Sequence, residues 1–115
     1  MKIRIKGNSL RYRLTRSDVD EFSATGYIEE TTDFGMQTLT YAIQQNRLNN
    51  LSAMFENNKI TLLIPENLVG EWRYTDRVGF EYQYKGLYLL VEKDFKCLDE
   101  VLEDQSDNYP NPRLG

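Results

Sequence analysis

Residues 7–22 read GNSLRYRLTRSDVDEF, and residues 57–72 read NNKITLLIPENLVGEW. The two stretches align at a spacing of 50 positions, and the match is one of pattern more than of identity. Each has a polar turn, then a strand of alternating apolar and polar residues, then a short helix with an N-terminal signal. The aligned apolar pairs are Leu10 with Ile60, Tyr12 with Leu62, Leu14 with Ile64, Val19 with Val69 and Phe22 with Trp72. The chain is therefore predicted to contain two copies of one supersecondary unit, each with an apolar face that needs the other.

Each stretch is predicted to form a hairpin with the residues before it. A two-residue turn at positions 7–8 pairs Ile5 with Leu10 and Ile3 with Tyr12. All four apolar side chains then share one face, and the intervening cations share the other. A shift of one residue would bring the cations into the core, so the register is well specified. The same reasoning places a turn at residues 57–58.

A helix and a second hairpin follow in each half. Thr15-Arg16-Ser17-Asp18 resembles a capping box, Gly26 is a plausible helix stop, and Pro65 suits the first turn of the second helix. In the first half, strands are expected at 27–32 and about 37–43. In the second half, the strand containing Phe80, Tyr82 and Tyr84 turns at Lys85-Gly86 and returns through Leu87–Val91. Residues 44–50 (QQNRLNN) form a polar bridge between the halves.

These elements predict an α+β domain with a mostly antiparallel, barrel-like sheet made of two pseudo-symmetric ββαββ halves. One domain, 1–103, would hold the repeats at about 1–45 and 51–95, with a short helix near 98–103. An acidic tail containing Pro and Asn, 104–115, is expected to be mobile unless a partner or the basic hairpin holds it. The alternative is a split barrel, or another α+β sheet in which the repeat is an accident of strand-turn-helix order.

Composition limits the compartment and the class of protein. A chain of 115 residues with 40% hydrophobic residues is long enough for one packed domain. The single cysteine, Cys97, can form no internal disulfide, and the opening MKIRIKGNS has charges where a signal peptide has an apolar run. No segment has the length of apolar sequence that a membrane helix requires. We therefore expect a cytoplasmic protein with no membrane partner.

Few residues suit catalysis. The chain has no histidine, which removes the commonest general base and metal ligand, and a single cysteine cannot build a zinc site. Adjacent Glu29 and Glu30 point to opposite faces of a strand and cannot act as a pair. Cys97 is interpreted as a packing residue, with a reactive thiol as the alternative because Lys93 and Lys96 lie near it in sequence. We expect no catalytic residue, no metal site and no cofactor.

Charge is distributed unevenly along the chain. Residues 1–16 carry six cations and no acid, while the remainder carries eight cations and 18 acids. Facing cations on neighbouring strands repel by roughly 0.2–1 kcal/mol per pair, so a negative partner is expected. That partner is either internal, from the C-terminal acids or from Glu29, Glu30 and Asp33, or external, as a nucleic acid or an acidic protein. The candidate anion- or nucleic-acid-binding residues are Lys2, Arg4, Lys6, Arg11 and Arg13.

Residues 7–14 resemble the motif of the AbrB/MazE-like swapped-hairpin proteins. Gly7, Asn8, Ser9, Arg13 and Leu14 match that motif, while Thr15 replaces its proline. The second half keeps Ile64-Pro65 but has Leu63 in place of the arginine. The resemblance covers about 1–45 and 51–93. The opening MKIRIKGNS also resembles that of a small bacterial family with no assigned function.

The resemblance implies that this chain forms alone, as a monomeric pseudo-dimer, the barrel that two interleaved chains form in that family. It also implies DNA binding or antitoxin function through Arg13, with neighbouring Lys6 and Arg11. Leu63 argues against a two-fold DNA site, because the second half then offers only Lys59. We expect a small non-catalytic binding or interaction protein of antitoxin-like, regulatory type with an unidentified protein partner. The alternatives are a nucleic-acid-binding protein and an enzyme of unrecognised type.

Overall fold

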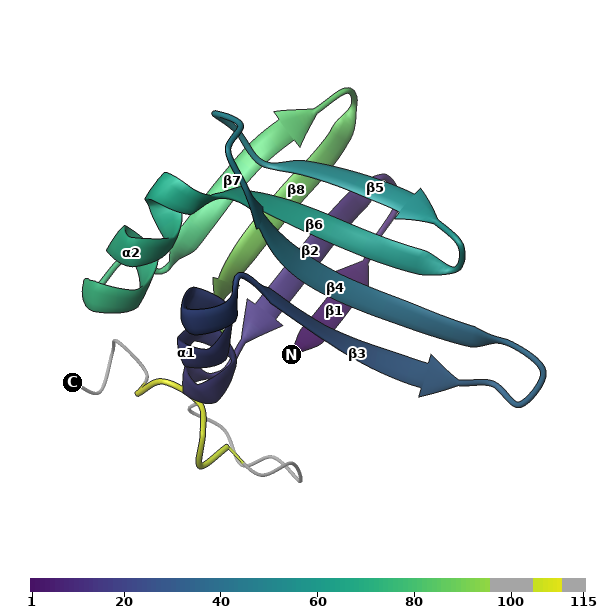
Figure 1. The fold of residues 1–115 in the computed structure, drawn as a ribbon, viewed down its shortest axis with the longest axis horizontal. Coiled ribbons are helices and arrows are strands. Elements are labelled where there is room, and N and C mark those ends of the chain that lie inside the picture. The colour runs from purple at the N-terminus through teal and green to yellow at the C-terminus, as the bar shows by residue number, and fades with distance from the viewer. Residues whose placement is uncertain (96–104, 111–115) are drawn as a thin grey trace.

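The computed structural model of the protein describes residues 1–95 and 105–110. Within these residues it contains eight strands and two helices arranged as two facing sheets, with both helices at the same end of the sheets (Figure 1). The elements in order are β1 (Lys2–Ile5), β2 (Ser9–Leu14), α1 (Arg16–Thr25), β3 (Tyr27–Asp33), β4 (Thr38–Asn46), β5 (Ser52–Glu56), β6 (Lys59–Pro65), α2 (Glu66–Tyr74), β7 (Gly79–Tyr84) and β8 (Leu87–Lys93). The order ββαββ therefore occurs twice, as predicted.

The hairpin registers are those that the apolar pattern predicts. In β1–β2, Ile5 pairs with Leu10 and Ile3 with Tyr12. In β5–β6, Phe55 pairs with Ile60 across a turn at positions 57–58, both of which have positive φ. Positive φ at both central residues matches the right-handed twist of the flanking strands, and asparagine tolerates it better than most residues. The turn at residues 85–86 is of the same kind.

Helix α1 begins and ends as its sequence signals predict. The Thr15 hydroxyl accepts a hydrogen bond from the Asp18 amide (3.3 Å), and the Asp18 carboxylate accepts one from the Thr15 amide (3.0 Å). Gly26 ends the helix at φ +80°, and its amide donates to the carbonyl of Phe22 (2.8 Å). Helix α2 has no such side-chain cap and starts directly after Pro65.

Sheet A has the strand order β1-β2-β8-β7 and sheet B the order β3-β4-β6-β5. The four hairpin ladders are antiparallel, whereas the two central ladders, β2–β8 and β4–β6, are parallel and join one half of the chain to the other. Both sheets are therefore mixed, and most of their ladders are antiparallel, as predicted.

The expectation of a closed barrel is wrong. Among the described residues, no ladder joins β1 to β3 or β5 to β7, so each sheet keeps two free edges. Side chains fill the seam between β1 and β3: the Tyr41 hydroxyl donates to the Met1 carbonyl (3.3 Å) and to the Glu30 carboxylate (2.9 Å). Burial, together with the contact to Glu30, raises the pKa of Tyr41 to about 12. A side chain thus lies where a closed barrel would have backbone hydrogen bonds.

The polar bridge between the halves is shorter than predicted. Residues 44–46 belong to β4, where Gln45 pairs with Ile64 and Asn46 with Pro65. The parallel ladder satisfies the backbone of this segment regardless of its side chains. Composition alone therefore misplaced the end of the strand.

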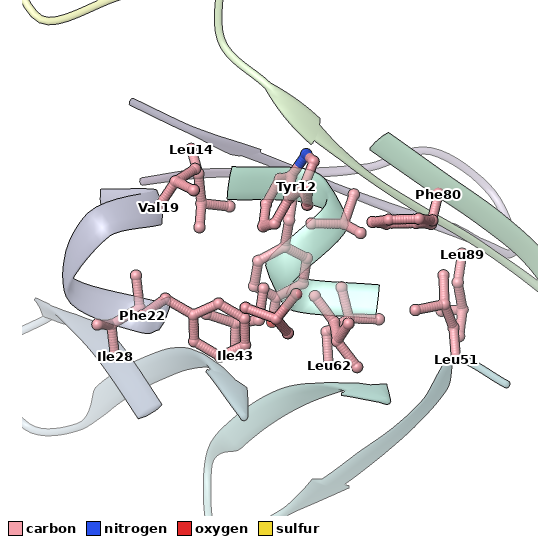
Figure 2. Packing of buried hydrophobic residues seen from close by; sticks show 14 of the residues in the cluster. Tyr12, Leu14, Val19, Phe22, Ile28, Ile43, Leu51, Leu62, Phe80 and Leu89 are labelled. Carbon is pink, nitrogen blue, oxygen red and sulfur yellow. The ribbon is translucent and has the colours of Figure 1, made fainter. Parts of the chain in front are cut away.

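The core lies between the two sheets and extends under both helices. Figure 2 shows aromatic and aliphatic side chains from both sheets and from α1 meeting in one layer. Tyr12 is fully buried, and its hydroxyl donates to the carbonyl of Ile60 in the opposite sheet (3.1 Å). Burial raises the pKa of Tyr12 well above the ordinary tyrosine value. The largest fully buried side chains are Trp72, Tyr12, Phe22, Leu14, Ile43, Leu62, Ile64 and Leu89.

Residues 105–110, which belong to the predicted acidic tail, lie against the start of α1 and the end of β8. The Arg16 amide donates to the Asp107 carbonyl (3.1 Å), and the Ser17 hydroxyl donates to the Asp107 carboxylate (3.0 Å). The Tyr109 amide donates to the Asp94 carbonyl (2.8 Å). Hydrogen bonds from Thr15 and Ser17 hold the pKa of Asp107 below its ordinary value of 3.8. The helix expected near 98–103 and Cys97 lie outside the described residues.

Candidate anion-binding surface of the first hairpin

The five sequence-predicted cations lie together on the outer face of sheet A. Arg11 and Arg13 alternate along β2 with buried residues that face the core. The strand pleat therefore places these two arginines, their register partners Arg4 and Lys2, and by the same alternation Lys6 on the opposite side. Four of them and Ile3 line a shallow hollow of about 150 Å³. The cations that line it are Lys2, Arg4, Arg11 and Arg13, and Lys6 lies beyond it at the hairpin turn.

Glu92 of β8 accepts hydrogen bonds from two of the arginines. Parallel pairing of β2 with β8 sets Glu92 beside Arg13. Its Oε1 accepts a hydrogen bond from Nε of Arg11 at 2.7 Å and from Nε of Arg13 at 3.1 Å, and Nη2 of Arg11 also donates to it. The Glu92 side chain is 16% exposed, so much of this ion cluster is shielded from water.

Asp94 pairs with Lys2. It follows β8, is almost fully buried, and its Oδ2 lies 3.1 Å from Nζ of Lys2. Burial of an unpaired carboxylate is costly, so this ion pair accounts for the position of Lys2 against the end of β8. A second internal acid therefore reduces the positive charge of the hairpin.

Arg4 and Lys6 have no ion-pair partner among the residues that the structure describes. Both are exposed, and they flank Ile5, whose side chain is 57% exposed. The surface thus divides into an inner part, where Glu92 and Asp94 offset two of three positive charges, and an outer part at the sheet edge with free positive charge.

Sequence reasoning found the cations but not their internal partners. The internal partners it considered were the acids of the C-terminal stretch, of which Asp99, Glu100, Glu103 and Asp104 lie outside the described residues, or Glu29, Glu30 and Asp33. Glu30 instead contacts Met1 and Tyr41, and Asp107 contacts the start of α1. The alternation in LYLLVEKD (87–94) does place Glu92 on the outer face of its strand, but only the parallel pairing of β8 with β2 brings it to the arginines.

The charge of the outer face changes along the central rows of sheet A. One row of neighbouring residues across the sheet runs from Arg4 through Arg11 and Leu90 to Glu81. Glu81 accepts a hydrogen bond from the hydroxyl of Tyr88, which raises the pKa of that tyrosine. The face therefore changes from basic at β1 to acidic at β7.

Residues 1–113 match the model of a family described as a family of unknown function (DUF7009). The chain belongs to this family. The match spans all the described strands and helices and the docked residues 105–110, so membership of DUF7009 covers both repeats together. No curated protein and no solved structure matches the chain.

The second hairpin of this DUF7009 member does not repeat the basic surface. Positions 61 and 63, which correspond to Arg11 and Arg13, are Thr61 and Leu63. Lys59 is the cation of its outer face, and its Nζ lies 4.6 Å from the ring centroid of Tyr27, in cation–π distance. Only the first hairpin therefore groups exposed cations.

Residues 1–95 and 105–110 contain neither a metal-ligand cluster nor a membrane-spanning helix. No group of three or more Cys, Asp or Glu side chains there could hold a metal ion. None of the helices there has the length and apolar composition needed to cross a membrane.

Proposed function

We propose that this protein is a small, non-catalytic binding protein of regulatory or antitoxin-like type that holds an acidic segment of a partner protein against the β1–β2 hairpin. The observation that carries the proposal is the pair of exposed cations, Arg4 and Lys6, that have no ion-pair partner among the described residues. Arg4 lines the hollow together with Arg11 and Arg13, and Lys6 lies next to it at the hairpin turn. Exposed cations next to a hollow bind carboxylates at little cost in desolvation.

A short acidic segment fits this surface better than a nucleic acid. Nucleic-acid binding needs several cations that follow successive phosphates. Here Glu92 and Asp94 offset two of the three inner positive charges, Glu81 adds negative charge toward β7, and the net charge of the chain is −4. The free positive charge is therefore local, which favours a few carboxylates over a phosphate backbone.

The strand pairing supports a pseudo-symmetric, swapped-hairpin interpretation of the fold. Exchanging β1–β4 with β5–β8 converts the order of sheet A into that of sheet B, and the two parallel ladders into each other. We infer that the halves are related by an approximate two-fold axis and that the chain acts as a monomeric pseudo-dimer. The different residues on the two outer faces then leave a basic surface on the first of the two hairpins and not on the second.

Fluorescence anisotropy tests the proposal with two labelled probes, an acidic peptide of alternating Glu and Val and a single-stranded oligonucleotide of equal length. We expect the peptide to bind, with an affinity that falls as salt increases. The double variant Arg4→Glu with Lys6→Glu should lose this binding. The matched control, Lys59→Glu with Lys85→Glu, makes the same change in net charge at positions away from the hollow and should keep this binding.

Two results would contradict this function. Equal losses in both double variants would mean that net charge, and not the hairpin, controls binding. Tighter binding of the oligonucleotide than of the peptide, with a steep salt dependence, would instead assign the surface to nucleic acid.

A further inference from the structure

We propose that the acidic segment binds as an added β-strand along the free edge of β1. This inference rests on the proposed function and adds the mode of binding and the pattern of the ligand. It follows from three features of β1: the direction of its backbone groups, the exposure of Ile5, and the charge of the side chains beside it.

The backbone groups of Ile3 and Ile5 point away from β2. Lys6 and Ser9 exchange both of their backbone hydrogen bonds (3.3 and 3.1 Å), so they form a hydrogen-bonded pair of the antiparallel ladder. Hydrogen-bonded and non-bonded pairs alternate, which makes Ile5–Leu10 and Ile3–Tyr12 non-bonded pairs. The N–H and C=O groups of both isoleucines therefore face the open edge.

The contacts of Met1 agree with this assignment. Met1 lies two residues before Ile3, so its backbone carbonyl points the same way as those of Ile3 and Ile5. This carbonyl accepts the hydrogen bond from Tyr41 across the seam to sheet B. Beyond that point, the backbone groups of Ile3 and Ile5 have no hydrogen-bond partner among the described residues. The edge is thus closed at one end by Tyr41 and open along the next few residues.

The side chains specify what an added strand must carry. Ile5 lies on the inner face of sheet A, yet 57% of its side chain is exposed, while its register partner Leu10 is buried. Arg4 and Lys6 alternate with it on the outer face. A strand beside β1 would therefore place apolar side chains next to Ile3 and Ile5 and acidic side chains next to the cations. The expected ligand is an extended segment with acidic and apolar residues in alternation.

Charge also argues against two alternatives: a second copy of the chain as the partner of β1, and β5 as the edge that binds the acidic strand. Pairing β1 with β1 of a second copy would bring two rows of cations onto one face, and such repulsion is how edge strands avoid self-association. The edge strand β5 has Met54 and Glu56 at the positions that correspond to Arg4 and Lys6. An acidic strand therefore suits β1 and not β5.

Loss of a single backbone donor tests strand addition. Ile5→Pro removes an N–H that faces the open edge and leaves the ladder to β2 intact, which is the position where proline is tolerated in a strand. Ile5→Ala is its control, because it removes the same side chain and keeps the N–H. We expect the Ile5→Pro variant to bind the Glu/Val peptide roughly tenfold more weakly than the Ile5→Ala variant, since an unpaired acceptor remains.

A second measurement avoids dependence on the folding of the proline variant. The peptide N-methylated at alternate residues should bind the wild-type protein roughly tenfold more weakly than the plain peptide when the methyls face β1. The isomeric peptide, methylated at the other alternate residues, should bind like the plain one. Hydrogen exchange of the Ile3 and Ile5 amides should slow when the plain peptide is bound.

The outcomes separate the two proposals. Unchanged binding of both methylated peptides, with no protection of the two amides, would overturn strand addition and leave side-chain binding of the acidic segment in place. Absence of binding by any acidic peptide would overturn the proposed function as well. Self-association of the wild type that Ile5→Pro abolishes would assign the edge to a second copy of the chain and overturn the acidic ligand.

Discussion

Glu92→Gln should strengthen acidic-peptide binding while it destabilises the fold. Glu92 is the carboxylate that accepts hydrogen bonds from both Arg11 and Arg13 on the proposed binding face. Glutamine keeps the size of the side chain and removes its charge. The two arginines then remain on the surface without their internal counter-charge.

The magnitudes follow from the geometry. The arginine side chains are 30% and 40% exposed, so we discount the lost ion pairs to about 1 kcal/mol of unfolding free energy. That corresponds to a fall in Tm of roughly 3–6 °C for a chain of this length. Removal of one negative charge about 6 Å from a bound carboxylate is worth roughly 0.7 kcal/mol in a water-like dielectric, or about threefold in affinity.

The assay is peptide anisotropy at several salt concentrations, with thermal unfolding of the same samples. Glu81→Gln is the matched control, because Glu81 is on the same face but contacts Tyr88 instead of the arginines. The gain in affinity should appear for Glu92→Gln alone and should fade as salt screens the charges. A variant that is destabilised but binds no better, or an equal gain for Glu81→Gln, would refute the assignment of the hollow.

Four more changes test the fold. Tyr12→Phe should lower the free energy of unfolding by roughly 1 kcal/mol, measured by urea denaturation, because it removes the buried hydrogen bond to Ile60. Asp107→Asn should lower Tm slightly at neutral pH. The folded pKa of Asp107 is depressed, so the stabilisation from its charged form is present above pH 3.8 and is lost as pH falls through the folded pKa. The Tm values of the variant and the wild type should therefore converge in acid. Gly79→Ala should destabilise by roughly 1–3 kcal/mol or more in thermal unfolding, because a Cβ would lie 2.0 Å from the Val91 carbonyl oxygen. Gly70→Ala, where a Cβ meets nothing within 4 Å in a helix, should stabilise by up to about 1 kcal/mol.

Local signals in the sequence predicted the local structure well. Hairpin registers follow from period-two alternation around short turns, and the capping box at Thr15 with Gly26 as the stop fixes α1. These features depend on residues a few positions apart, so one sequence contains the information for them. The grouping of the five cations was predictable for the same reason.

Contacts between the halves were not predictable in this way. The identity of Glu92 as the partner of Arg11 depends on a parallel register between segments far apart in the chain, which alternation alone leaves undetermined. The open seams likewise depend on how the two twisted sheets cross. The alternation of apolar and polar residues around Tyr41 would be the same in a closed barrel, so it does not predict that this side chain lies at an open seam. The position of Asp107 could not be predicted either, because its contacts are with the start of α1, 90 positions away in the chain.

The two parallel ladders have different consequences for the time course of folding. Tyr41 and Ile60 in sheet B are separated by 19 positions, whereas Leu10 and Leu89 in sheet A are separated by 79. Closing the longer loop from the unfolded chain costs roughly 1.3 kcal/mol more in entropy, by the logarithmic dependence on length. Sheet B is therefore expected to nucleate first, and the first and last hairpins meet only later to complete sheet A. During synthesis on the ribosome, β1 and β2 emerge first and must wait for the last strand, with the cationic edge to keep them from pairing with other chains.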